Sequence, residues 1–488
     1  MNPPSSSSTT KPHVHHGPPA ILPFILAIVI PLLYGVFAAP LFQSGANPDT
    51  NANRLQVVIA SFDDGPIGES FLSFFQNFSP SKSWITNNGA SPTTMPTFVF
   101  ESNKTSTIDT LRQDVIDNKY WAAIILHSSI SSSYSQAMLS SSLAKAYNPT
   151  NALTLIWDDA RNNIVSVPRI AGPMKGLLSA FGSASTSKLL AQWTAKGSPS
   201  SGFNMSNPSD AAALNKMLSA PIQFSEESLF PMTVPSINIA VTVGQILVCV
   251  FGIVITNMIW GPLKMHFFIA SASPGLAKGI RRYILILAYS CMVGVAFSTI
   301  LIGIAQTNNT GILSQNFASP SITYGATSAA SKFDGSVWAQ TWALMWIQSA
   351  IFTLWLMIPS TIVGDPSPAG LLLAPMIIYN SISINVDVSD IGFQFFYWAP
   401  MWHSSELLRN IMFGTLKSKV AMHVGIHFLW FIVETILFFL ASVVEGKKAA
   451  AAAVVASSSS TVKAIDGVTS EVPEKIVVEL PQGVVVSQ

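Results

Sequence analysis

The sequence between residues 421 and 443 reads AMHVGIHFLWFIVETILFFLASV and places a single carboxylate, Glu434, among mostly apolar side chains. A helix of about 20 apolar residues is long enough to cross the hydrocarbon core of a bilayer. Five further runs share this length and composition: 20–42, 236–259, 283–304, 338–362 and 367–385. The sequence therefore predicts an α-helical membrane protein with six transmembrane helices.

The composition of the whole chain agrees with this prediction. Of its 488 residues, 49% are hydrophobic and 10% are charged, whereas soluble proteins average about 25% charged residues. The formal net charge of +1 argues against a nucleic-acid partner, because phosphate binding requires a basic excess or patch. Both cysteines, Cys249 and Cys291, lie in apolar runs, so no disulfide framework is expected outside the membrane.

The segment 43–234, between the first and second predicted spans, is mostly polar and large enough to fold as a domain. Runs rich in β-branched residues alternate in it with stretches of helical spacing, which favours a layered α/β domain. The expected strands are 54–63, 97–102, 119–127 and 151–159. The expected helices are 107–119, 128–147 and, with breaks, 163–220. Residues 235–443 then form a membrane domain of five helices.

The distribution of charge orients these segments. The loop 260–282 contains four basic residues and no acidic one, which is typical of a cytoplasmic loop. With six spans, both termini are then cytoplasmic, and we expect the polar tails 1–19 and 444–488 to be disordered. The domain 43–234 lies on the other side, and we expect the plasma membrane as its location. Three glycosylation sequons agree with this orientation: Asn77, Asn103 and Asn204.

An aromatic segment, 386–420, precedes the last span on the predicted outer side. Tryptophan and tyrosine favour the membrane interface, where one edge of the ring is apolar and the other is hydrated. We expect Pro400 to interrupt the helix, and 404–414 to form a short amphipathic helix capped by Ser404 or Ser405. The candidate functional residues of this segment are Trp398, Trp402, His403, Glu406 and Arg409, the last two spaced to pair along one helix face.

The order of these segments resembles that of known membrane-protein families. A single first span, a cysteine-free α/β domain, five more spans and an aromatic segment before the last one resemble the ABC-2-type permease architecture. The stretches DNKYWAAIILHSSIS (117–131) and FYWAPMWHSSELLRNIMFGT (396–415) resemble the fungal nitrosoguanidine-resistance membrane protein family (DUF3533) and its bacterial relatives of the phage-infection-protein type. The resemblance implies a multispan protein linked to tolerance of toxic compounds and to membrane lipid organisation. Membrane lipids and an amphipathic or drug-like substrate are the partners it implies, and a homo-oligomer is compatible with it.

The motifs of several enzyme classes are missing. The sequence contains no GxxxxGK[ST] and no GxSxG, so we expect neither a P-loop ATPase nor a serine hydrolase. His423 and His427 are four residues apart and can share a zinc ion on one helix face, with His403 as a third ligand. The catalytic glutamate of an HExxH motif is replaced by Val424. We therefore favour two hydrogen-bonded histidines and predict no metal, no cofactor and no enzymatic activity.

Polar residues inside the predicted spans suggest a pathway. Glu434 lies in the middle part of the last span, where a carboxylate is costly and usually faces a cavity or a partner. It is either a polar point or proton carrier in a pathway, or a protonated side chain bonded between helices. Gln245, Gln348 and Asn380 are milder candidates, for which bridging between helices is the more common role.

Three functions are compatible with the sequence alone. The first is a membrane protein that moves or arranges amphipathic molecules or lipids without its own ATPase. The second is a non-transporting scaffold or receptor, whose outer domain binds a partner while the spans anchor it. A membrane metalloenzyme using His423 and His427 is the third and weakest reading.

Overall fold

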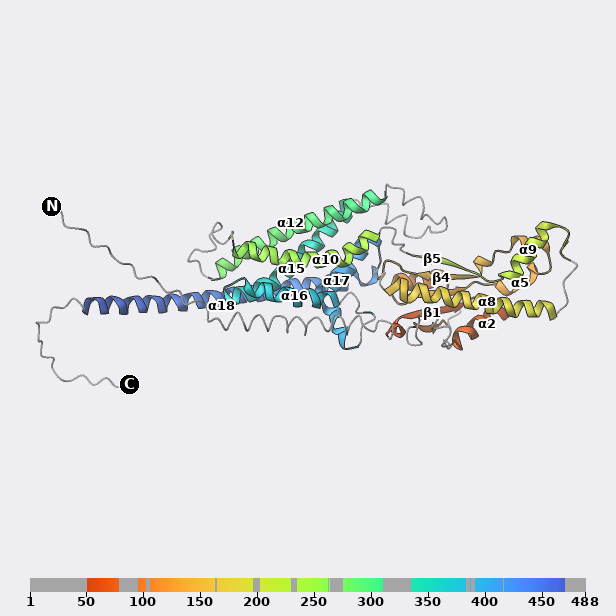
Figure 1. Cartoon of the computed structure of the whole chain (residues 1–488), viewed down its shortest axis with the longest axis horizontal. Coiled ribbons are helices and arrows are strands. Elements are labelled where there is room, and N and C mark those ends of the chain that lie inside the picture. Colours follow the sequence, from red (N-terminus) through yellow and green to blue (C-terminus); the bar gives the residue numbers. More distant parts are fainter. Residues whose placement is uncertain are drawn as a thin grey trace, which may run out of the picture.

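The computed structural model describes residues 51–78, 95–101, 106–162, 165–195, 202–229, 235–261, 263, 275–309, 335–382, 387, 391–415 and 417–469. The expected first span 20–42, the tail 1–19 and the sequon at Asn103 lie outside the described residues. Figure 1 shows an elongated molecule with an α/β domain at one end and a helical bundle next to it. The last helix extends from the bundle away from the α/β domain.

A five-stranded mixed sheet forms the centre of the α/β domain. Its strand order is β2-β1-β3-β4-β5, and only the β3–β4 pair is antiparallel. The expected strands are all present, and a fifth, β5, joins them. Their bounds are β1 Gln56–Ser61, β2 Thr97–Phe100, β3 Ala122–Leu126, β4 Leu153–Trp157 and β5 Phe224–Ser228. Strands β3 and β4 are buried throughout, as strands covered on both faces are.

Helices cover both faces of the sheet. Successive side chains of a strand point to opposite faces, and in β1 Val57 and Ile59 contribute to one core while Val58 contributes to another. The larger core includes residues of α2 (Pro66–Gln76), α5 (Ile130–Ala137) and α8 (Gly172–Ala195). The smaller core includes residues of α4 (Ile108–Ile116). The helices α6 (Ser141–Ala146) and α9 (Pro208–Ser219) complete the domain.

One helix expected in this domain is divided. The stretch 128–147 contains α5 and α6, which are separated at residues 138–140. The N–H of Ser141 donates to the Gly202 carbonyl at 3.1 Å instead of to a carbonyl of the preceding helical turn. Serine competes with helical hydrogen bonding and favours helix starts, and the run Ser140–Ser141–Ser142 therefore begins a new helix.

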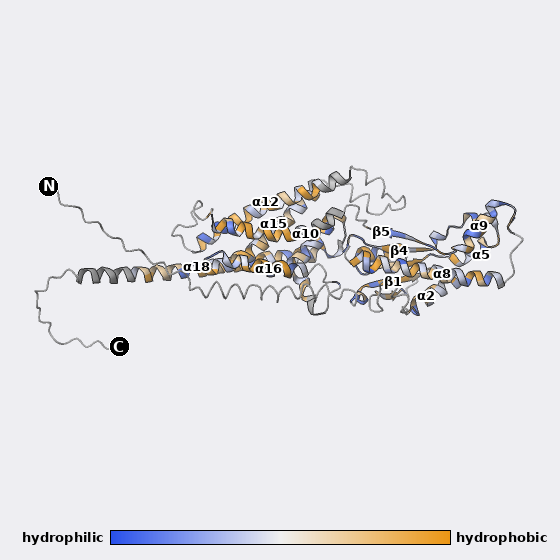
Figure 2. Cartoon of the chain, viewed as in Figure 1, coloured by the Kyte–Doolittle hydropathy of each residue, from blue (hydrophilic) through white to orange (hydrophobic). Residues whose placement is uncertain are grey.

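In the described part of the chain, five long helices form the bundle: α10 (Pro235–Trp260), α12 (Gly275–Asn309), α15 (Gly335–Val363), α16 (Ser367–Ile382) and α18 (Val420–Thr469). Each begins within eight residues of the predicted span start, and α15 packs against all four others. Three described stretches are long and apolar enough to cross a membrane: 275–303, 335–363 and 420–458, and α10 carries a shorter apolar stretch, 244–260. Figure 2 shows apolar residues along these helices. The structure is thus consistent with a membrane protein.

The last helix is longer than the sequence predicted. We expected disorder from residue 444, but α18 continues to Thr469. Five alanines at 449–453 explain this extension, because alanine has the highest helix propensity of all residues and no proline follows before residue 473. The prediction of a disordered tail is therefore wrong for residues 444–469.

The end of the bundle that lies away from the α/β domain is held by close packing and charge. A Cβ atom on Gly275 of α12 would lie 2.6 Å from the Cα of Gly446 in α18, so the two helices touch through their backbones. Beside this crossing, the Glu445 carboxylate accepts from Lys278 at 2.6 Å and from Arg282 at 2.7 Å. Small residues permit such a backbone approach in membrane helices, and the ion pairs lie beside the crossing.

Candidate functional site

A pocket of about 350 Å³ lies between the α/β domain and the aromatic segment. Three regions of the α/β domain contribute to it, as do the aromatic segment and the start of α18. The lining residues are Arg54, Leu55, Asn118, Trp121, Arg161, Asp387, Tyr397, Trp402, Glu406, Lys419 and His423. We call this cavity the junction pocket. Its walls combine aromatic rings with charges of both signs, a lining suited to a molecule that is partly apolar and partly ionic.

Arg161 is the fixed cation of the α/β wall. It follows β4 in a turn in which the Asp158 carboxylate accepts the N–H groups of Ala160 at 2.9 Å and Arg161 at 3.1 Å. The Arg161 guanidinium lies 3.7 Å from the centre of the Trp121 ring and donates one N–H to the Tyr120 carbonyl at 3.0 Å. Stacking on an aromatic face and one hydrogen bond hold the group in place, and its other N–H groups remain available to a ligand.

The opposite wall comes from the aromatic segment. A 3-10 helix over Ile391–Trp398 brings Tyr397 next to Asp387, to which its hydroxyl donates at 3.0 Å. The Tyr397 and Trp402 rings meet edge to face with centroids 4.8 Å apart. Glu406 accepts from Arg409 in a buried ion pair, so the pairing predicted from their spacing is present.

Charges of both signs line the junction pocket. Burial lowers the pKa of Arg161, and the Asp387 carboxylate is the largest influence that opposes this shift. Among the described residues, however, no ion pair joins Arg161 to Asp387. Burial, and next to it the positive charge of Arg161, lower the pKa of Lys419. The charges therefore influence one another without being neutralised by direct contact.

Two buried histidines lie at the junction pocket: His423 lines it, and His403 contacts His423. His403 and His423 approach each other with their Nδ1 atoms 3.0 Å apart, and the Trp402 ring lies 5.0 Å from each imidazole. Burial lowers the pKa of His403 to about 4, which keeps that ring neutral at physiological pH. Within the described part of the chain, no group of three His, Cys, Asp or Glu side chains is arranged to hold a metal ion. The zinc hypothesis for His423 and His427 gains no support.

Hydroxyl and amide groups fix the helix that carries Trp402 and His403. This helix, α17, spans Pro400–Phe413, so the prediction that it begins at Ser404 or Ser405 is wrong. Proline fits the first helical turn because its missing N–H has no intrahelical partner there. The two serines bond to α10 instead: Ser404 donates to the Gln245 side chain, and Ser405 donates to the Val241 carbonyl at 3.3 Å.

The four residues predicted for a pathway divide into two groups. Gln245 accepts from α17, and the Asn380 side-chain oxygen accepts the N–H of Met401 at 3.3 Å, so these two bridge helices. Gln348 and Glu434 are also buried, at 0% and 2% exposure, but their side-chain oxygens and nitrogens find no hydrogen-bond partner among the described residues. Because buried polar groups are normally paired, Gln348 and Glu434 are the stronger candidates for function.

The remaining aromatic and glycosylation candidates lie outside the pocket. Trp398 is 58% exposed, and its carbonyl accepts from the Trp430 indole at 2.6 Å. Asn77 and Asn204 are exposed on the α/β domain, where a glycan has room.

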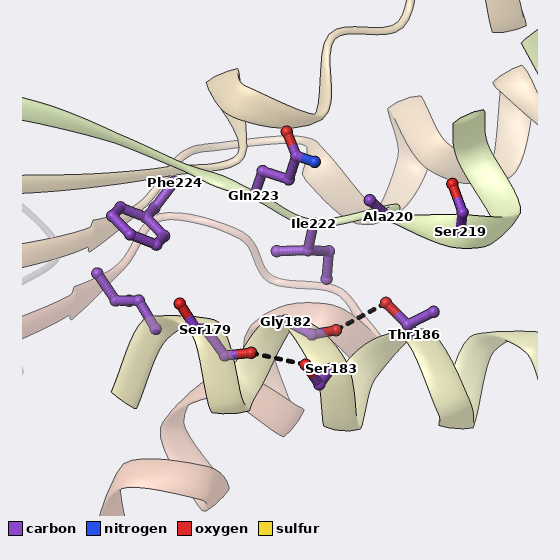
Figure 3. A pocket seen from close by; sticks show the side chains of 10 residues that line it. Ser179, Gly182, Ser183, Thr186, Ser219, Ala220, Ile222, Gln223 and Phe224 are labelled. Atoms are coloured by element: carbon purple, nitrogen blue, oxygen red, sulfur yellow. Dashed lines mark hydrogen bonds between the residues drawn. The ribbon is translucent and has the colours of Figure 1, made fainter. Parts of the chain in front are cut away.

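A second pocket lies within the α/β domain, between α8 and the chain that leads into β5 (Figure 3). Its cavity measures about 470 Å³ and carries hydroxyl groups but no charge. The Ser183 hydroxyl donates to the Ser179 carbonyl at 2.9 Å, and the Thr186 hydroxyl donates to the Gly182 carbonyl at 2.7 Å. Because these two hydroxyl groups already donate within their own helix, this pocket presents fewer free polar groups to a ligand than the junction pocket does.

Sequence reasoning found one half of the junction pocket and missed the other. Trp402 and Glu406 line it and His403 and Arg409 support it, as the aromatic segment suggested. Arg161 and Asn118, in the α/β domain, were not predicted. The run WDDAR at 157–161 held a signal, since charges that directly follow a fully buried strand lie at the edge of a sheet, where sites are common.

Comparison with known proteins gives a family but no activity. No curated protein matches the chain, and no solved structure does. A family model described as a protein of unknown function (DUF3533) matches residues 23–436. This match includes the α/β domain, the aromatic segment and α18 as far as Ile436, and so the chain belongs to the DUF3533 family.

Proposed function

We propose that this chain is an integral membrane protein of the ABC-2 permease type that moves or arranges lipids or other amphipathic molecules, without an ATPase of its own. The junction pocket is the observation that carries the proposal. It combines ionic groups with three aromatic rings, those of Trp121, Tyr397 and Trp402, at the end of an apolar helical bundle. An amphipathic molecule can place its polar part among these groups while its apolar part stays in the bilayer.

The proposal includes a topology of six spans with both termini in the cytoplasm, in the plasma membrane. The basic residues Lys278 and Arg282 lie at the bundle end formed by the α12–α18 crossing, and Lys448 donates to the Ile362 carbonyl at 3.0 Å at the end of α15. The α/β domain lies at the opposite end (Figure 1). A cationic end typically faces the cytoplasm, so the junction pocket opens on the outer side.

Exposed aromatic residues beside the pocket support a role at the membrane surface. In the 3-10 helix, Phe395 and Trp398 are 57% and 58% exposed, whereas Phe396 is buried. Large exposed rings near a bundle end are typical of the interface between lipid headgroups and acyl chains. A lipid that leaves the outer leaflet therefore passes these rings before its headgroup reaches Tyr397 and Trp402.

Glu434 supplies a polar point deeper in the bundle. It lies on the face of α18 that also carries the buried His427 and Phe438, seven residues before it and four after it, and residues at this spacing share a helix face. An unpaired carboxyl at this depth usually serves a pathway or a proton transfer. We propose that it accompanies the polar group of the substrate or exchanges a proton during its movement.

The experiment is a leaflet assay in proteoliposomes. Fluorescent lipids and an amphipathic cationic dye are followed across the bilayer with the wild-type protein, with Lys419→Gln at the pocket and with Lys216→Gln on the distant helix α9. We expect the wild type and Lys216→Gln to accelerate exchange and Lys419→Gln to do so less. Exchange equal to that of empty liposomes, with and without added cell extract, would contradict the proposal and favour the scaffold role.

A further inference from the structure

We propose that the junction pocket binds a zwitterionic headgroup, in which a phosphate diester and an ammonium group lie a few bonds apart, as in phosphoethanolamine and phosphocholine lipids. This inference rests on the proposed function in taking a lipid as the ligand. It goes further by assigning the two charges of that ligand to opposite walls of the pocket.

The phosphate side is the wall that carries Arg161. Apart from its bond to the Tyr120 carbonyl, the guanidinium makes no hydrogen bond in the described part of the chain, and its N–H groups match the oxygens of a phosphate. Lys419 lines the same pocket and has no hydrogen bond or ion pair among the described residues. These two cations lie close enough to affect each other's charge, and an anion between them would relieve their repulsion.

The ammonium side is the wall formed by Asp387, Tyr397 and Trp402. The Asp387 carboxylate accepts from the Tyr397 hydroxyl at 3.0 Å and from the Asn162 amide at 3.5 Å, which holds it at the pocket. Aromatic rings beside a carboxylate are a favourable environment for a quaternary or primary ammonium group. A ligand with both charges would therefore complete the interaction that Arg161 and Asp387 do not make directly.

Two buried side chains that line the pocket carry polar atoms with no hydrogen-bond partner in the described part of the chain, and these atoms are available to a ligand. Asn118 is 6% exposed, and neither atom of its amide is bonded. His423 is 1% exposed, and its Nε2 atom is unbonded. Burying such a group unpaired costs roughly 1–3 kcal/mol in mutational data, so native proteins usually supply a partner. The oxygens of a phosphate or of a glycerol ester can accept from Asn118.

The size of the cavity agrees with a headgroup and not with a whole lipid. Ligand pockets typically measure about 300–1,000 Å³, and the junction pocket, at about 350 Å³, is at the lower end of that range. The acyl chains would therefore remain outside it, next to the exposed Phe395 and Trp398.

The test measures binding to the full-length protein in detergent with four probes. These are a short-chain phosphatidylcholine, its chain-free headgroup glycerophosphocholine, a short-chain phosphatidylglycerol and a single-chain trimethylammonium amphiphile. The variants are Arg161→Gln and Asp387→Asn, and the control is Asp365→Asn in the exposed turn before α16. Melting temperatures without ligand identify any variant that fails to fold, and Lys419→Gln replaces Arg161→Gln in that event.

We expect the zwitterionic lipid to bind most tightly and glycerophosphocholine to compete with it. Arg161→Gln should weaken the binding of phosphatidylcholine at least about tenfold, because a charge-assisted hydrogen bond to the phosphate is lost. It should weaken the binding of the trimethylammonium amphiphile less, because that probe has no phosphate. Asp387→Asn should abolish the preference for phosphatidylcholine over phosphatidylglycerol. Asp365→Asn should change neither the affinity for phosphatidylcholine nor the preference for it over phosphatidylglycerol.

Three results would overturn the inference: equal binding of all lipid probes, tightest binding of the cationic amphiphile, or phosphatidylcholine binding that neither pocket variant changes. These three results can be distinguished from results that contradict the proposed function. A protein that exchanges lipids in liposomes but shows no headgroup preference refutes only the zwitterionic site, whereas a protein that exchanges no lipid and no dye refutes the transport role.

Discussion

The close crossing of α12 and α18 allows a prediction in which two glycines of one helix respond oppositely to the same substitution. Gly446 and Gly425 both lie in α18. A Cβ on Gly446 would lie 2.7 Å from the Cα and 2.8 Å from the N of Gly275, whereas a Cβ on Gly425 would meet none of the described residues within 4 Å. Gly446→Ala therefore forces α12 and α18 apart, and Gly425→Ala does not.

The magnitude follows from this difference in contact. Alanine favours a helix over glycine by about 1 kcal/mol, and this gain is common to both variants. Overpacking costs roughly 1–3 kcal/mol and applies only to Gly446→Ala. Separating the helices would also lengthen the contacts of Glu445 with Lys278 and Arg282, now 2.6 and 2.7 Å. We expect the two variants to differ in free energy of unfolding by about 1–3 kcal/mol, with Gly446→Ala the less stable.

The assay is unfolding of the purified protein in mixed micelles with increasing denaturing detergent, followed by tryptophan fluorescence. Gly425→Ala should unfold at the wild-type detergent fraction or above it, and Gly446→Ala below it. The same order should hold for apparent melting temperatures. Equal midpoints for the two alanine variants would refute the close backbone contact on which the reasoning depends.

Three further predictions concern charged groups. Burial raises the pKa of Asp158 from 3.8 to about 7, so stability falls as the pH rises from about 4 to about 7, where the unfolded chain loses this proton and the folded chain keeps it. Between pH 5 and 8 the loss covers about two pH units at about 1.4 kcal/mol each, and Asp158→Asn should therefore reduce it by about 3 kcal/mol, as measured by urea unfolding at each pH. Arg409→Met leaves Glu406 buried without its partner and should cost roughly 3–5 kcal/mol, and a double variant with Glu406→Leu should recover much of this in the same micelle assay. Glu434→Gln should leave the unfolding midpoint nearly unchanged, because the two side chains have similar shape and the carboxyl has no partner to lose, but should slow lipid exchange in liposomes; unchanged exchange would remove Glu434 from the pathway.

The helices of the bundle could be predicted because apolar composition and length are local properties. The runs 236–259 and 338–362 became α10 and α15 with ends displaced by at most three residues. The buried strands β3 and β4 were equally visible, since every residue in them is buried. The strand β5 was missed because it reads FSEES, is only partly buried and lacks any apolar alternation. Its glutamates serve ion pairs instead: Glu227 contacts Arg112 at 2.5 Å and Glu226 contacts Lys175 at 2.6 Å.

In the junction pocket too, local pairings could be predicted from the sequence, whereas contacts between distant segments could not. Glu406 and Arg409 are three residues apart, and their pairing follows from helix geometry alone. Arg161 and Asp387 are separated by more than two hundred residues, and nothing in either local sequence specifies that they face one cavity. Asn118 adopts φ 58°, a left-handed conformation that asparagine tolerates better than most residues, and only the folded chain shows that its amide lies in the pocket without a partner.

The aromatic segment connects the two parts of the molecule physically, and this makes it the element through which lipid binding and bundle motion would be linked. Phe413, at the end of α17, packs against both the smaller core of the sheet and the core of the bundle. The same helix is bonded to α10 through Ser404 and carries Trp402 and Glu406 into the junction pocket. Tightly packed interiors transmit displacement instead of absorbing it. Because α17 packs against α10, α15 and α18 as well as the core of the sheet, a displacement within the bundle would be transmitted to the wall of the junction pocket that Trp402 and Glu406 form. If the proposed lipid binding holds, α17 is therefore the element through which an occupied junction pocket would act on the bundle.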